Sequence, residues 1–100
     1  YDPEAWVRAA LDAGMGYVVV GAKHHEGFAL FDTAVNDWNA RAATPAARDL
    51  LRPLVEACRR GGLPIGFYYS QAQDWINGGS TIAGTWDSPA QDRDFDDYLD

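Results

Sequence analysis

Residues 17–22 read YVVVGA and run directly into KHHEGF at residues 23–28. Nearly every side chain of YVVVGA is apolar or β-branched, and no polar residue alternates with them. A strand of this kind is buried on both faces, as in a parallel sheet. The sequence therefore predicts a buried parallel strand whose carboxyl end leads into a lysine, two histidines and a glutamate.

A second stretch of the same kind, PIGFYYS, occupies residues 64–70. Two arginines and two glycines at residues 59–62 are typical of a helix end, because cations favour the last turn and glycine the residues after it. Pro53 would break a helix interior, so this helix is expected to begin near residues 50–52, capped by Asp49. We predict that it joins two adjacent parallel strands as a right-handed crossover.

Helices are also expected near both ends of the chain. Asp2 can cap a helix whose first residue is Pro3, and Gly14 can end it. Pro89 opens a helical pattern that still continues at Asp100. The chain therefore reads as an internal piece of a larger domain, truncated at both ends.

Two copies of one αβ unit are suggested by glycines that precede each strand, Gly14 and Gly62, at an offset of 48 residues. Alternating helices and strands predict the α/β class, with a parallel sheet and the helices outside it. The architecture is either a (β/α)₈ barrel or a doubly wound open sheet. Since a barrel needs ~250 residues, roughly 40% of one is present.

The chain has 100 residues, 47% of them hydrophobic and 13% aromatic, and a net charge of −7. This composition is that of a water-soluble globular protein and excludes a disordered polar chain. The longest apolar run, residues 13–22, is about half of the roughly 20 residues that a membrane span requires. No basic stripe suits nucleic acid or an anionic membrane. The single cysteine, Cys58, excludes an internal disulfide and is expected in the core.

In both architectures, ligands bind at the carboxyl ends of the strands. The first strand leads into His24 and His25, in a loop that extends to about residue 49 and is much longer than the usual roughly 2–6 residues. The second strand leads into SQAQDW at residues 70–75. Candidate functional residues therefore gather at one edge of the predicted sheet.

His24 and His25 admit three interpretations. With Glu26 they could bind zinc or iron, but neighbouring histidines at a strand end point to opposite sides, and neither HExxH nor a cysteine pair accompanies them. We therefore assign no metal and no cofactor. They could also be hydrogen-bonding residues that pack the rim, or they could bind the hydroxyls of a sugar beside aromatic faces. The aromatic side chains considered for that role are Phe28, Phe31, Trp38 and Tyr68.

Strand alternation sorts these residues by face. The residues expected on the inner face of a barrel are Val18, Val20, Ala22, Gly66, Tyr68 and Ser70, and those expected outward under the helices are Ile65, Phe67 and Tyr69. His24 then continues on the inner face and His25 leaves it. Tyr68 becomes a candidate substrate contact, with a buried tyrosine satisfied by the backbone as the alternative.

A series of motifs resembles the α-L-fucosidases of glycoside hydrolase family 29. They are AKHHEGFALFDT, a DWN turn, PxxRDL, LVEACRRGGL, GFYYS and DW. The resemblance implies a (β/α)₈ TIM-like barrel, of which this chain would be a part with two parallel strands and flanking helices. Residues 1–100 would then be an internal fragment of a glycosidase catalytic domain that hydrolyses terminal α-L-fucose with retention and without a cofactor.

The same resemblance assigns site residues by motif position. His24 and His25 would hydrogen-bond fucose hydroxyls, and Tyr68 would line the fucose pocket. The family's nucleophile and acid/base would lie beyond Asp100, so no catalytic residue is expected in the chain. Glu26 stands where the family usually has aspartate, which would shift the histidine loop slightly.

The carboxylates near the predicted mouth agree with that expectation. They are Glu26, Asp32, Asp37 and Asp74. A glycosidase needs one carboxylate as general acid and one as nucleophile or base. None of the four is placed by its spacing to do so, and Asp32 and Asp37 look like turn residues beside Asn36 and Asn39.

The leading interpretation is a retaining exo-α-L-fucosidase that acts on fucosylated oligosaccharides or glycoconjugates. The alternative is a fucose-binding or catalytically degenerate barrel that keeps the pocket and lacks the carboxylates. The partner expected in either case is a fucosylated carbohydrate, with no nucleic acid and no membrane.

Overall fold

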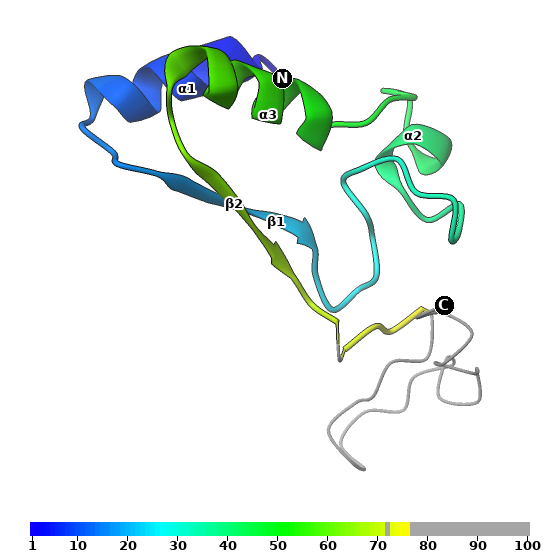
Figure 1. The fold of residues 1–100 in the computed structure, drawn as a ribbon. Helices are drawn as coiled ribbons and strands as arrows, with labels where there is room; N and C mark the ends of the chain where they lie inside the picture. The colour runs from blue at the N-terminus through cyan, green and yellow to red at the C-terminus, as the bar shows by residue number, and fades with distance from the viewer. Residues whose placement is uncertain (72, 77–100) are drawn as a thin grey trace.

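The computed structural model describes residues 1–71 and 73–76 and has the predicted α/β class (Figure 1). The elements in chain order are α1 (Pro3–Asp12), β1 (Val18–Lys23), α2 (Ala40–Ala43), α3 (Leu51–Gly61) and β2 (Ile65–Tyr69). Short α2 lies within the long loop that the sequence predicts, and the helix expected from Pro89 falls outside the described residues. None of the described helices has the length and apolar character that a membrane span requires.

Strands β1 and β2 form one parallel pair, as predicted, with α3 in the connection between them. Val18 pairs with Ile65, 47 residues later, so the predicted offset of 48 is wrong by one. The register shifts between Gly21 and Lys23, which makes Ala22 an extra residue of β1. A β-bulge of this kind locally interrupts the alternation of side chains between the two faces.

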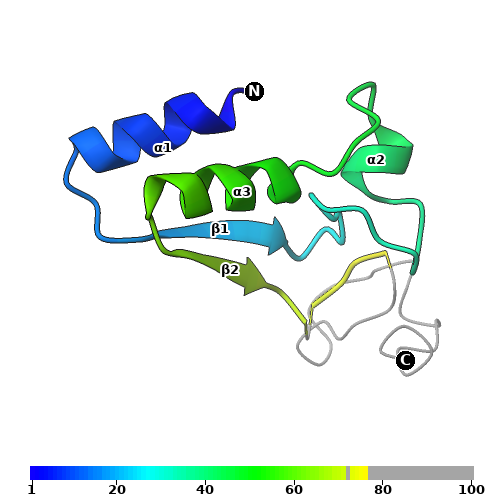
Figure 2. The same ribbon diagram turned by 45° about the horizontal axis from the view of Figure 1, so that its top comes forward.

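Helices α1 and α3 lie side by side and cover one face of the strand pair (Figure 2). The core there consists of Val7, Ala10, Leu54, Ala57, Cys58 and Leu63, with Val18, Val20 and Ile65 packed against it. Cys58 is in the core, as predicted, and burial raises the pKa of its thiol.

Val18 and Val20 therefore face the helices, and the prediction that they face the opposite, inner side is wrong. Side chains of a strand alternate between its two faces with a period of two. The one-residue error in the offset therefore assigns the side chains of Val18 and Val20 to the wrong face of β1.

The face away from the helices carries Val19, which is 59% exposed. Tyr68 pairs with Gly21 and shares that face, as the alternation predicts for the second strand. Ile65 packs against the helices, also as predicted. Phe67 and Tyr69 were expected beneath the helices as well, but they stay 47% and 43% exposed, because the core formed with α1 and α3 reaches β2 only at Ile65.

The helix ends follow their local sequence signals. Asp2 caps α1 by accepting a hydrogen bond from the backbone N–H of Ala5 at 3.1 Å. Asp49 accepts two hydrogen bonds of 2.8 Å from the first turn of α3, as its predicted capping role requires. A Cβ atom on Gly61 would lie 2.8 Å from Cγ1 of Val7, so the glycine lets the end of α3 approach α1 closely.

Candidate functional site

The carboxyl ends of β1 and β2 lie at the same edge of the sheet, where the following loops meet (Figure 1). Two backbone hydrogen bonds join these loops. The N–H of Ser70 donates to the carbonyl of Lys23 at 3.0 Å, and the N–H of Trp75 donates to the carbonyl of His25 at 2.8 Å. Segments that are far apart in the sequence are thereby held together at the edge where the candidate site was predicted.

The three predicted site residues, His24, His25 and Tyr68, gather at this edge. The ring centroids of His24 and His25 are 4.2 Å apart, and those of His24 and Tyr68 are 5.2 Å apart. His24 and Tyr68 are exposed, whereas His25 is half-buried. Their nitrogens and the phenol hydroxyl can exchange hydrogen bonds with hydroxyl groups, and the rings offer apolar faces.

The bulge at Ala22 explains why His24 meets Tyr68. Val18 and Val20 face the helices, so unbroken alternation would carry His24 to the helix side as well. The extra residue reverses the alternation and brings the His24 ring next to Tyr68. Alternation along the sequence also predicts His24 and Tyr68 on one face, but only because two errors cancel: the wrong face for β1 and the unrecognised bulge.

Ser70 anchors the ring of His25. The hydroxyl oxygen of Ser70 lies 2.6 Å from Nδ1 of His25, and Ser70 is only 5% exposed. The same hydroxyl donates a hydrogen bond of 3.2 Å to the carbonyl of Gln73. The orientation of the His25 ring is therefore tied to the segment that follows β2.

A buried ion pair joins Lys23, the last residue of β1, to Asp74, in the segment that follows β2. Nζ of Lys23 is 2.9 Å from Oδ2 of Asp74, and the side chains are 2% and 0% exposed. Nζ also donates to the carbonyl of Gln73 at 3.2 Å, and Oδ1 of Asp74 accepts from the N–H of Ile76 at 3.0 Å. Sequence reasoning missed this pair. The available signal was a lysine that directly follows an apolar strand, together with an aspartate after the neighbouring strand.

Gly27 allows the histidine loop to pack against this pair. Its φ of +83° is a left-handed conformation that side chains disfavour. A Cβ atom at this position would lie 2.6 Å from Oδ1 of Asp74. Both the backbone conformation and the space therefore require glycine.

Of the aromatic residues expected beside the histidines, Tyr68 has a ring contact with His24. Among the ring contacts of the described residues, His25 meets Trp75 with a centroid distance of 6.4 Å. Phe28 instead packs edge-on against Trp38 at 5.2 Å. Trp75, in the DW motif, is thus the aromatic residue that sequence reasoning did not single out.

The DWN turn is structural. Asn39 is 2% exposed, and its Oδ1 accepts hydrogen bonds of 3.0 Å from the backbone N–H groups of Arg41 and Ala42, in the first turn of α2. Its Nδ2 donates to the carbonyl of Asn36 at 2.7 Å. Asp32 forms an exposed ion pair with Arg41. These contacts support the interpretation of this segment as a turn.

No metal site is apparent in the part of the chain that the structure describes, since no three His, Cys, Asp or Glu side chains there are grouped to hold an ion. Of the four carboxylates named near the predicted mouth, Asp32 and Asp74 are already engaged in ion pairs. The arrangement at the strand ends suits hydrogen bonding to a polar ligand.

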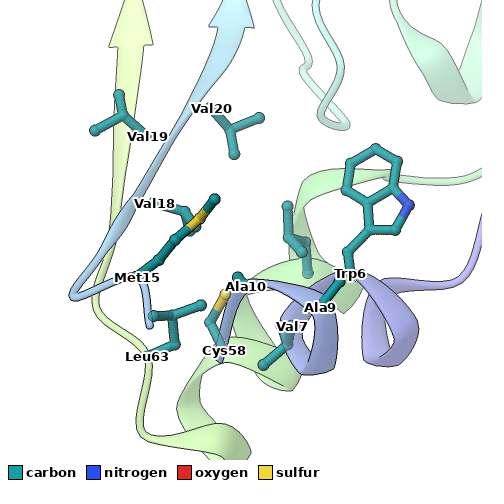
Figure 3. A pocket seen from close by; sticks show the side chains of 11 residues that line it. Trp6, Val7, Ala9, Ala10, Met15, Val18, Val19, Val20, Cys58 and Leu63 are labelled. Carbon is teal, nitrogen blue, oxygen red and sulfur yellow. The ribbon is translucent and has the colours of Figure 1, made fainter. Parts of the chain in front are cut away.

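An apolar pocket of about 410 Å³ lies between α1, α3 and β1 (Figure 3). Its lining consists of Trp6, Val7, Ala9, Ala10, Met15, Val18, Val19, Val20, Leu54, Cys58 and Leu63. A sugar requires several hydrogen-bonding partners, and this lining offers almost none. The pocket borders the helix core and includes none of the strand-end residues, so it is not the candidate site.

The sequence matches the family model described as alpha-L-fucosidase over residues 1–99. The chain belongs to the α-L-fucosidase family. The family resemblance drawn from the KHHEG and FYYS motifs is thereby confirmed.

Curated relatives and solved structures agree with this assignment. The tissue α-L-fucosidase of Rattus norvegicus is 41% identical over 71 residues, which cover 70% of this chain and 15% of that protein. The α-L-fucosidase isoenzyme 1 from Paenibacillus thiaminolyticus superposes with a TM-score of 0.82 at 45% identity, over 99% of this chain and 25% of that one. The α-L-fucosidase AlfC from Lactobacillus casei, in complex with its α-L-fucose product, superposes with a TM-score of 0.81 at 39% identity. The match covers 96% of this chain and 34% of that one. The chain thus spans about a third or less of each of these proteins.

Proposed function

We propose that this chain supplies part of the fucose pocket of a retaining exo-α-L-fucosidase, in which His24, His25 and Tyr68 bind the sugar. The observation that carries the proposal is the meeting of these three side chains at the carboxyl ends of two parallel strands, with ring centroids 4.2 and 5.2 Å apart. Family membership supports the substrate class, terminal α-L-fucose on oligosaccharides or glycoconjugates.

The proposal includes the architecture. Residues 1–100 form an internal part of a (β/α)₈ catalytic barrel, in which the face that carries Val19 and Tyr68 is the barrel interior. The parallel pairing of β1 and β2 through α3 and the helices on one face support it. An isolated pair of strands is marginal in water, which also favours completion by further strands.

The proposed chemistry divides the work between this chain and the rest of the barrel. Retention requires a nucleophilic carboxylate and an acid/base carboxylate about 5–5.5 Å apart. Asp74 is held by Lys23 and by the N–H of Ile76, so it is a poor candidate for attack on an anomeric carbon. We place both catalytic carboxylates after Asp100, and leave to this chain the binding of hydroxyls.

The test is steady-state kinetics of the intact protein on an aryl α-L-fucoside, with His24→Ala, His25→Ala and Tyr68→Phe. Each substitution removes a hydrogen bond worth about 0.5–1.5 kcal/mol, so kcat/KM falls about 2- to 13-fold. His24, whose ring lies next to Tyr68 and is exposed, should show the larger loss of the two histidines.

A matched control is Arg60→Gln, which removes an exposed ion pair with Glu4 between α3 and α1 and leaves kcat/KM unchanged. Lower melting temperatures with kcat/KM intact in the histidine variants would mean that the rings only pack the rim. Fucose binding by the intact protein without hydrolysis would instead identify a carbohydrate-binding barrel.

A further inference from the structure

The hydroxyl of Ser70 has one proton and two partners. Its oxygen lies 2.6 Å from Nδ1 of His25 and 3.2 Å from the carbonyl oxygen of Gln73. A carbonyl oxygen can only accept, so both contacts are hydrogen bonds at the same time only when the hydroxyl proton points to Gln73. In that arrangement the bond to His25 takes its proton from Nδ1.

The Gln73 carbonyl is held in place by Lys23. Nζ donates to that oxygen at 3.2 Å and to Asp74 at 2.9 Å, and both charged side chains are at least 98% buried. The carbonyl oxygen has two lone pairs, so it accepts from Lys23 and Ser70 together. The ion pair thereby holds in place the carbonyl oxygen of Gln73, to which the hydroxyl of Ser70 donates.

The backbone next to the ring is fixed as well. The N–H of Trp75 donates to the carbonyl of His25 at 2.8 Å, and the N–H of Ser70 donates to the carbonyl of Lys23 at 3.0 Å. The imidazole of His25 is therefore constrained at its backbone and at Nδ1, while the opposite ring nitrogen, Nε2, is the one left for a ligand.

We propose that Ser70 is a positioning residue that sets the tautomer of His25. In the neutral ring Nδ1 carries the proton, and Nε2 presents a lone pair. His25 then accepts a hydrogen bond from a substrate hydroxyl rather than donating one. The consequence for the sugar rests on the proposed function, whereas the tautomer is a property of the ligand-free protein.

The first experiment is heteronuclear NMR of the imidazole nitrogens in the intact, ligand-free protein, at a pH where histidine is neutral. The expected result is a protonated Nδ1 and an unprotonated Nε2 for His25. Ser70→Ala should shift the population toward protonated Nε2, and Ser70→Thr, which keeps a hydroxyl, should restore the original tautomer. A predominantly protonated Nε2 in the wild type, or a tautomer that Ser70→Ala leaves unchanged, would overturn the inference.

Steady-state kinetics distinguish a positioning role of Ser70 from a purely structural one, because only the former changes KM. Ser70→Ala should lower kcat/KM about tenfold, mainly through KM, because the ring is no longer oriented for the hydroxyl. Ser70→Thr should recover most of this loss. A lower melting temperature with an unchanged KM would show that Ser70 only stabilises the loop and would contradict its positioning role.

The direction of the hydrogen bond is tested with deoxy and deoxyfluoro analogues of α-L-fucose, whose dissociation constants are measured for the wild type and His25→Ala. Fluorine can accept a hydrogen bond but has no proton to donate. At the hydroxyl that His25 binds, fluorine should therefore fail to restore the affinity lost in the deoxy sugar. Restored affinity would mean that His25 donates and would overturn the inference. If His25→Ala changes no affinity, the proposed function fails, while the NMR result still decides the tautomer.

Discussion

Between α1 and α3 the buried side chains are apolar, whereas those buried at the carboxyl ends of the strands include polar and charged ones. The helix side is filled by residues such as Leu54 and Cys58, which are at most 4% exposed and contribute by excluding water. The strand-end side buries Lys23, Ser70 and Asp74 to a similar degree, and each of them has a directional partner. The same degree of burial therefore excludes water from apolar side chains on the helix side and encloses hydrogen-bonded polar groups on the strand-end side.

Apolar burial is non-directional and tolerates replacement by a group of similar volume. A buried ion pair gains little net stability, because desolvation of the charges offsets their attraction, but it fixes the positions of the groups it joins. We therefore interpret the apolar contacts on the helix side as the main contribution to folding stability. The polar contacts on the strand-end side then serve mainly to position the side chains of the candidate site. Substitutions on the two sides should separate these contributions.

The largest expected effect comes from Asp74→Asn. Lys23 is 2% exposed and would remain charged beside a neutral amide, so the free energy of unfolding should fall by about 3–5 kcal/mol. Denaturant unfolding of the intact protein measures this loss.

The matched control is the double variant Lys23→Met/Asp74→Asn, which removes the positive charge of Lys23 together with its carboxylate partner. Its stability should return close to that of the wild type, whereas kcat/KM should be lower than in the wild type because the Gln73 carbonyl has lost the hydrogen bond from Lys23. Equal destabilisation in the single and double variants would show that the pair does not act as a unit.

Leu54→Ala should have a somewhat smaller effect on stability and none on the site. Leu54 is 4% exposed in the helix core, and its truncation should cost about 2–4 kcal/mol, while kcat/KM of the folded protein stays unchanged. Unfolding curves and kinetics well below the transition measure the two quantities. Leu54→Met keeps the volume and should cost less than about 1.5 kcal/mol. A fall in kcat/KM for Leu54→Ala would mean that the core also positions the site.

Much of the fold was predictable, because it depends on neighbours along the chain. The apolar run at residues 17–22 predicted β1, and the second at residues 64–70 predicted β2. Asp2 and Asp49 predicted the starts of two helices, since a cap acts on N–H groups only two or three residues later. The position of the candidate site followed as well, because parallel strands place their carboxyl ends at one edge.

What was missed depends on contacts between distant residues. The pair of Lys23 and Asp74 joins positions 51 apart, and its one signal in the sequence is that each residue follows an apolar strand. The bulge has no signal at all, since Ala22 resembles any other small strand residue. A one-residue change of register reverses every side chain of a strand, so the facing of Val18 and Val20 could not be read from alternation alone.

Asp49 lies between the two regions and connects them. Its Oδ1 accepts from the first turn of α3, and its Oδ2 accepts from the N–H of Asp32, in the loop that leads from the histidines, at 3.0 Å. Burial alone would raise the pKa of this carboxyl, but the backbone hydrogen bonds and the charge of Arg52 outweigh it and hold the pKa below its ordinary value of 3.8.

The smallest expected effect follows from this contact, in Asp49→Asn. Because the folded-state pKa is depressed, the ionised carboxyl contributes its full stability above the unfolded-state pKa and loses it as the pH falls through the folded value. Asparagine can still cap α3, but its amide nitrogen cannot accept from Asp32, so stability at neutral pH should fall by about 1 kcal/mol. Melting temperatures of the wild type and the variant, measured against pH, should converge in acid as Asp49 becomes protonated. Parallel curves down to the lowest pH would show that the charge of Asp49 contributes nothing to the connection between helix core and site.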